Sequence, residues 1–385
     1  MLDDPVDSWQ PRREMRHLRQ AETVHVRQIN TSLPQPRDPR HGVAFCALHA
    51  QQLPELGPAP RLQVDAVPQR LAQPQPVAPA AVSFNPLNRN EVALAYQNIF
   101  VPQLVPSGWN GNVGSCNPGT TSAAYHQATI DRVNYFRVQA GLPGNVTIFN
   151  GSEPAGTQAA ALIYSAQHAL SHDPPSNWAC WTQAGHDAAA KSNIALSYGS
   201  DTAAGPNAVV MYMDDPGSGN GMAGHRRWLL YPPQAQMASG SIPYNPQWAA
   251  NALWVLGPFG SRPATPDGVA WPPRGYVPWQ VLPKTSNRWS FSWQGANFSA
   301  ATVSMTRNGV PLGAPTYETI ANGYGDNTLV WLPQGVTYLQ PATDITYHVT
   351  ISGISGGGAP STISYDVIVI DPYAPGDLII DNGFD

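Results

Sequence analysis

The middle of the chain carries apolar residues at helical spacing in two successive segments. Residues 121–140 open with Thr121-Ser122 and stop at Gly141-Leu-Pro143. Residues 159–170 repeat apolar side chains at i, i+3, i+4, i+7 and i+11 and stop at the Pro-containing stretch 171–175. Such spacing places the apolar side chains on one face of a helix. The sequence predicts two helices, whose apolar positions are Ile130, Val133, Phe136 and Ala140 in the first and Ala159, Leu162, Ile163, Ala166 and Leu170 in the second.

Shorter apolar segments follow these two helices. Residues 188–196 and 207–214 predict two further short helices, and the second is stopped by Asp215-Pro-Gly217. A Gly-rich loop comes next at 217–221, and the apolar run of 224–232 before two prolines suits a buried strand or a helix end. The G-x-G-x-G of the loop does not follow a strand of a βαβ unit, so we interpret it as a cavity-rim loop rather than a phosphate site.

The C-terminal third changes to a period of two. Apolar and polar residues alternate in 289–293, 345–351 and 363–369, which is typical of half-buried strands. The Gly-rich stretch 352–360 predicts a hairpin between the last two, and Arg307-Asn-Gly309 predicts another turn. About seven short strands in roughly 90 residues favour an all-β immunoglobulin- or fibronectin-like sandwich. No catalytic cluster is visible in this part.

The composition predicts irregular segments before, between and after the helical and the all-β parts. Of 385 residues, 12% are charged, 40 are Pro and 34 are Gly, so long irregular connections are expected. The predicted organisation is α+β, with five segments: a largely disordered Pro/Arg/Gln-rich tail or linker (1–105), a helical domain (106–262), a linker (263–280), a β-sandwich (281–373) and an acidic tail (374–385).

Charge and hydropathy exclude two classes of partner. A net charge of −5 does not supply the basic surface that nucleic acids require. The sequence contains no run of about 18 apolar residues, so we predict no transmembrane helix. No basic start followed by an apolar run stands at Met1, so no signal peptide is visible there.

The cysteines leave two interpretations open. Cys116 and Cys180 both lie in turn-rich sequence, and Cys46 is left over in the predicted tail. A Cys116–Cys180 disulfide would indicate an oxidising compartment, whereas two reduced buried thiols are the alternative. A thiol nucleophile formed by Cys180 with His186 is less well supported than the disulfide, because Cys116 offers a partner.

Four motifs in order resemble the superfamily of cysteine-rich secretory proteins, antigen 5 and pathogenesis-related proteins (CAP), especially its bacterial members. They cover about 130 residues, roughly a third of the chain. The first motif places Asn134 and Arg137 at the family's Asn and Arg positions before Ala140-Gly-Leu-Pro143. The others are Gln158-Ala-Ala-Ala-Leu162 through Leu170-Ser-His172, Ser192-Asn-Ile-Ala195, and Gly224-His-Arg-Arg-Trp-Leu-Leu-Tyr-Pro232.

The resemblance implies an α-β-α sandwich with a surface cavity lined by two His and one or two Glu that can hold a divalent cation. His172 and His225 take the two His positions, and Ser192 and Asn193 line the same cavity. Ser192 stands where the family has Glu, and a hydroxyl is a poor ligand for a divalent cation such as zinc. Asp214 or Asp215 would restore an anionic group.

Three functions remain as hypotheses. The first is an extracellular, periplasmic or cell-envelope protein whose His-lined cavity binds a small molecule, lipid, peptide or cell-wall component. The second is a metal-dependent hydrolase or peptidase-like enzyme that uses His172 and His225 with Asp214 or Asp215. The third is structural adhesion through the β-sandwich. The missing family Glu makes an enzyme the less favoured class. His168, opposite the apolar face of its helix, is expected to face solvent.

Overall fold

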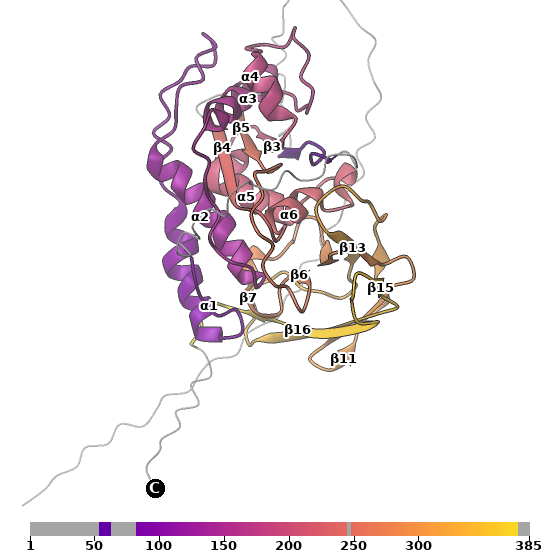
Figure 1. Ribbon diagram of the computed structural model, residues 1–385. Coiled ribbons are helices and arrows are strands. Elements are labelled where there is room, and N and C mark those ends of the chain that lie inside the picture. The colour runs from indigo at the N-terminus through magenta and orange to yellow at the C-terminus, as the bar shows by residue number, and fades with distance from the viewer. Residues whose placement is uncertain (1–53, 63–81, 245–247, 376–385) are drawn as a thin grey trace, which may run out of the picture. The chain divides into compact units, whose positions relative to one another are not determined.

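The computed structural model describes residues 54–62, 82–244 and 248–375, and these combine helices with several antiparallel sheets, an α+β organisation (Figure 1). A five-stranded sheet has the order β1-β3-β5-β4-β2. Its strands are β1 (Glu55–Leu56), β2 (Thr147–Ile148), β3 (Ser192–Ser197), β4 (Gln236–Ile242) and β5 (Ala249–Trp254).

Helices pack on both faces of this sheet, and they bury its central strands on both sides. In β3, Ile194 packs into one apolar cluster and the adjacent Ala195 into another, as alternation along a strand requires. The first cluster contains residues of α3 and α4, and the second contains residues of α2, α5 and α6. The helices are α2 (Ala123–Gln139), α3 (Glu153–Gln167), α4 (Gln183–Ala189), α5 (Gly205–Asp214) and α6 (Gly224–Leu229).

Most predicted helices are confirmed, with one error. Helix α2 begins after Ser122, whose hydroxyl accepts a hydrogen bond from the Tyr125 amide at 3.2 Å. Helix α3 ends at Gln167, before Leu170, and the following residue His168 adopts φ +60°. His168 is exposed, as expected. The predicted helix 188–196 is wrong: α4 ends at Ala189, and Ser192–Ser197 form strand β3 between β1 and β5.

The C-terminal part consists of two main sheets whose apolar faces share a core. One sheet has the order β11-β10-β14-β16-β7 and the other β12-β13-β8-β6, with a small β15-β9 pair beside them. Trp289 packs against Tyr347 across the core at 5.7 Å between ring centroids. The predicted alternating segments and both turns are confirmed. The strands are β8 (Trp289–Trp293), β9 (Ala296–Asn297), β10 (Thr302–Arg307), β11 (Val310–Pro311), β12 (Thr316–Tyr317), β13 (Asn327–Leu332), β14 (Ile345–Ser352), β15 (Ser355–Gly356) and β16 (Thr362–Ile370).

The segment predicted as a linker, 263–280, contributes two strands to these sheets. Strand β6 (Val269–Trp271) pairs antiparallel with β8, and β7 (Gly275–Pro278) pairs in parallel with β16. Trp271 is fully buried and packs against Phe136 of α2, with 5.3 Å between ring centroids. The cores of the helical and the all-β parts are therefore continuous through this segment.

Part of the predicted tail 1–105 is also ordered. Helix α1 (Arg89–Ala95) continues into a π-helix (Tyr96–Phe100) and a 3-10 turn (Val101–Gln103). Residues 54–62 add strand β1 to the first sheet. Residues 1–53 with Cys46, and most of the predicted acidic tail (376–385), lie outside the described residues.

Cys116 and Cys180 form the predicted pair, with their Cα atoms 5.0 Å apart and a separation of 64 positions in sequence. This geometry selects the disulfide over two free thiols, and it leaves Cys180 unavailable as the nucleophile beside His186. Within the described ranges, no helix is long and apolar enough to cross a lipid bilayer.

Candidate functional site

His225 and Asp215 form a fully buried pair. Asp215 directly follows α5 in a left-handed turn (φ +58°), which directs its carboxylate toward the start of α6. Its Oδ1 lies 2.8 Å from His225 Nδ1, and its Oδ2 accepts the His225 amide at 3.0 Å. Because a carboxylate only accepts hydrogen bonds, Nδ1 carries the ring proton, and in the neutral ring Nε2 presents a lone pair.

The surroundings of His225 fix its ring but leave two polar atoms unused. Tyr212 of α5 stacks on the imidazole, with 5.5 Å between centroids, and Asn193 Nδ2 donates to the His225 carbonyl at 3.1 Å. His225 Nε2 and Asn193 Oδ1 are both buried, and neither has a hydrogen-bond partner among the described residues. Buried polar atoms are nearly always paired, so these two mark a place where a ligand or water could bind.

His172, the second predicted histidine, contacts two backbone carbonyls. Its Nδ1 is 2.7 Å from the carbonyl of Ala189, and its Nε2 contacts the carbonyl of Pro58. A neutral ring can donate to only one of these carbonyls, and both contacts favour the charged ring. Burial lowers the pKa of His172 and outweighs the two carbonyl contacts.

The other predicted site residues are engaged elsewhere. The Ser192 hydroxyl is buried and donates to the Ala188 carbonyl at 2.8 Å. The Asp214 carboxylate accepts the amides of Thr285 and Ser286 at 3.0 and 2.8 Å. The two adjacent aspartates thus separate: Asp215 joins His225, whereas Asp214 binds the segment that precedes β8.

These donors do not fit the zinc ion that the resemblance implied. Both His172 nitrogens contact carbonyl oxygens, and His225 offers only Nε2. In the described part of the chain, no three His, Cys, Asp or Glu side chains are grouped as a metal ion requires.

Arg226 and Arg227, which follow His225 in α6, connect the site to the all-β part. Arg226 donates to the carbonyls of Met213, Asp214 and Arg288, and Arg227 donates to those of Ala321 and Asp326. Burial lowers the pKa of each guanidinium to about 10, so both stay charged at neutral pH. Their partners are mainly carbonyl oxygens.

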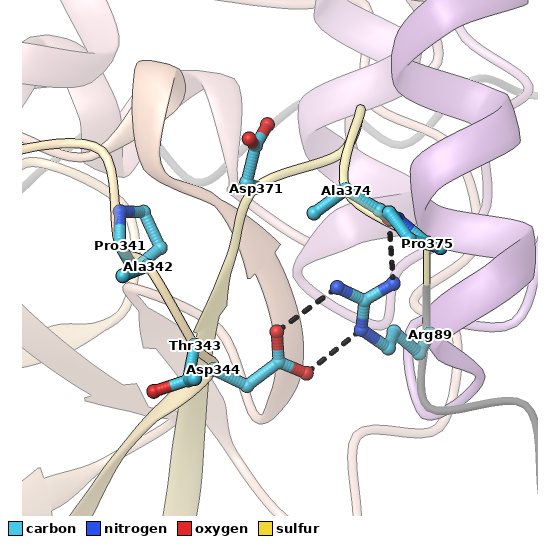
Figure 2. Close-up of a pocket in the computed structure, with 8 residues that line it drawn as sticks. All are labelled: Arg89, Pro341, Ala342, Thr343, Asp344, Asp371, Ala374 and Pro375. Carbon is cyan, nitrogen blue, oxygen red and sulfur yellow. Dashed lines mark hydrogen bonds and ion pairs between the residues drawn. The ribbon is translucent and has the colours of Figure 1, made fainter. Parts of the chain in front are cut away.

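A small cavity of about 100 Å³ lies away from this site, beside the start of α1 (Figure 2). Arg89 spans it, with Nε and Nη2 2.7 and 3.0 Å from the two carboxylate oxygens of Asp344. Asp371 on its wall accepts from Gln340 at 2.7 Å. These polar groups bind one another. We therefore interpret the Arg89–Asp344 ion pair as a structural link between α1 and the all-β part, and not the cavity as a ligand site.

Acidification is expected to destabilise the protein through His172. Its pKa is lowered on folding, so the unfolded chain binds the extra proton more readily, and stability falls as pH drops below the ordinary histidine pKa. We expect the melting temperature to decrease between about pH 7.5 and about pH 5, and to decrease less in His172→Gln. Thermal melts across this range measure it.

The matched control is His168→Gln, which alters an exposed histidine at the end of α3. His126, whose pKa is also lowered by burial, keeps some pH dependence in every variant. Identical pH profiles for His172→Gln and the wild type would contradict the assignment.

Comparisons with known proteins return no match: no family model, no curated protein and no solved structure is significantly similar to this chain.

Proposed function

We propose that this chain is a CAP-type binding protein that acts outside the cytoplasm and takes its ligand at the Asp215–His225 pair. Three features support the family assignment: the four motifs in order, helices on both faces of a mixed sheet, and the placement of His172 and of Gly224, which precedes His225, against the adjacent residues 58 and 59. The cysteine pair at disulfide distance and the all-β part, taken as immunoglobulin-like, support an oxidising, extracytoplasmic location.

Two observations carry the proposal: His225 Nε2 and Asn193 Oδ1 are both buried without a hydrogen-bond partner among the described residues, and the two residues are in contact through the Asn193 amide nitrogen and the His225 carbonyl. Both atoms accept hydrogen bonds, and the Asp215 contact fixes the ring that presents one of them. A ligand with an N–H or O–H donor would satisfy both groups, which otherwise remain desolvated at a free-energy cost of about 1–3 kcal/mol each.

The test follows the imidazole directly in the wild-type chain labelled with ¹⁵N-histidine. Three probes are added in turn: a short Pro-containing peptide, a long-chain fatty acid and an N-acetylglucosamine oligomer. We expect one class to move the His225 Nε2 resonance and to raise the melting temperature. His225→Phe, which keeps a ring against Tyr212, should abolish the temperature shift, whereas His348→Phe on the exposed side of β14 should keep it.

If no probe class moves the resonance, or if His225→Phe binds as well as the wild type, the proposal is wrong.

A hydrolase is the second candidate, favoured by the Asp-oriented imidazole, which is the arrangement of a general base. Conversion of a probe to a product that is lost in His225→Phe would select it.

A further inference from the structure

Residues 54–62 contact strand β3, His172 and helix α6, which carries His225. Strand β1 extends the first sheet at the edge of β3, with Glu55 opposite Leu196 and Leu56 opposite Ala195 in antiparallel register. The pairing continues one residue further, because the Gly57 amide donates to the Ile194 carbonyl at 3.3 Å. This is the geometry by which an extended peptide adds a strand to an open sheet edge.

Beyond Gly57 the segment binds through the carbonyls of its prolines. The Pro58 carbonyl contacts His172 Nε2, and the Pro60 carbonyl accepts the indole N–H of the fully buried Trp228 at 2.6 Å. Proline has no amide donor, so a proline-containing chain can meet such donors without leaving an N–H of its own unsatisfied. The groove donors therefore match the backbone of the segment.

Small residues allow the close approach. Ala59 is buried, and a Cβ added at Gly224 of α6 would lie 2.6 Å from the Ala59 side chain. A Cβ added at Gly57 would lie 2.7 Å from the Ile194 side chain. The last described residue of the segment, Leu62, donates its amide to the Gly323 carbonyl at 3.0 Å.

Resting on the proposed function, we infer that this surface is a peptide-binding groove for an extended, proline-containing chain, and that residues 54–62 are its internal occupant. The contacts of residues 56–60 use backbone groups and small side chains, so a separate peptide with the pattern Leu-Gly-Pro-Ala-Pro can make them. Such a peptide competes with a tethered copy, whose effective concentration is of the order of millimolar.

The experiment releases the internal segment in the full chain. The double variant Gly57→Val/Ala59→Glu introduces a side chain against Ile194 and a charge beside Gly224. The probe is a fluorescein-labelled nonapeptide with the sequence of residues 54–62, measured by fluorescence anisotropy. We expect the variant to bind it at least ~10-fold more tightly than the wild type, because the tethered competitor is gone. The control variant Val310→Glu, on an exposed residue of β11, should behave as the wild type.

A change in the peptide tests the register without altering the protein. Replacing its glycine by N-methylglycine removes the donor that meets the Ile194 carbonyl, and we expect about 5-fold weaker binding. Should the double variant fail to fold, amide hydrogen exchange in the wild type replaces it. Excess free peptide should then speed exchange at Gly57 and Leu62 as the internal segment is displaced.

The outcomes separate this inference from the proposed function. Equal peptide affinity in the double variant and the wild type, or no effect of the N-methylglycine, would overturn the groove. If a fatty acid or sugar probe still moves the His225 resonance, the binding site itself stands. Peptide binding that survives His225→Phe would instead retain the groove and exclude His225 as a ligand contact.

Discussion

Arg226→Met is expected to lower the free energy of unfolding by about 3–5 kcal/mol. The Arg226 guanidinium is fully buried and donates to three carbonyls, those of Met213 (2.7 Å), Arg288 (2.8 Å) and Asp214 (3.0 Å). Methionine fills similar space but leaves these oxygens buried without a donor. Chemical denaturation at neutral pH, followed by tryptophan fluorescence, measures the loss.

Two further variants make this prediction specific. Arg226→Lys keeps the charge, but one ammonium cannot reach acceptors arranged for a planar guanidinium, so most of the loss should remain. Arg307→Met, at a partly exposed position of β10, should change stability by no more than about 0.5 kcal/mol. A small loss in Arg226→Met would show that the protein relaxes around the unpaired carbonyls.

Removing the disulfide is expected to cost about 2–4 kcal/mol. The Cys116–Cys180 bond closes a loop of 64 residues that contains all of α2 and α3, so its loss returns conformational freedom to a long segment of the unfolded chain. Cys116→Ser/Cys180→Ser should therefore melt at a clearly lower temperature than the wild type under oxidising conditions.

The same experiment in a reductant provides the control. Reduced wild type and the double serine variant should melt together, since both lack the cross-link. A wild-type melting temperature that does not respond to reductant, with both thiols free to alkylation, would contradict the pairing.

Local signals explain which elements the sequence predicted. The Ser122 cap and the Gly141-Leu-Pro143 stop lie within a residue or two of the ends of α2, so its bounds could be predicted. The Ala-rich stretch before β3 favours a helix locally, but pairing with β5, more than fifty residues later, makes Ser192–Ser197 a strand. Strands β6 and β7 are short and flanked by proline, and their partners β8 and β16 lie later in the chain.

Helix α1 lies within the segment that the sequence predicts as a tail, although residues 88–91 carry a helix signal. Asn88 followed by Glu91 is a capping pattern, and the Asn88 side chain accepts the amides of Asn90 and Glu91 at 3.0 and 3.2 Å. The Pro-rich composition before it suggested a tail up to residue 105.

The candidate site was predicted in part. His172, His225, Asn193 and Asp215 were named from the family resemblance, but the sequence could not choose between Asp214 and Asp215. The left-handed turn at Asp215 makes that choice. Tyr212 and Pro58 carried no sequence signal, because their roles arise from the packing of α5 against α6 and from a segment more than a hundred residues before His172.

The burial of Trp271 against Phe136 also determines where this chain can be cut. A truncation at residue 262, or a start at 281, would divide one apolar core and leave Phe136 or the edge of β16 exposed to water. Separate expression of the helical and all-β parts should therefore give aggregating fragments, whereas coexpression of the two pieces should allow them to reassemble. Functional experiments on either part are best done in the intact chain.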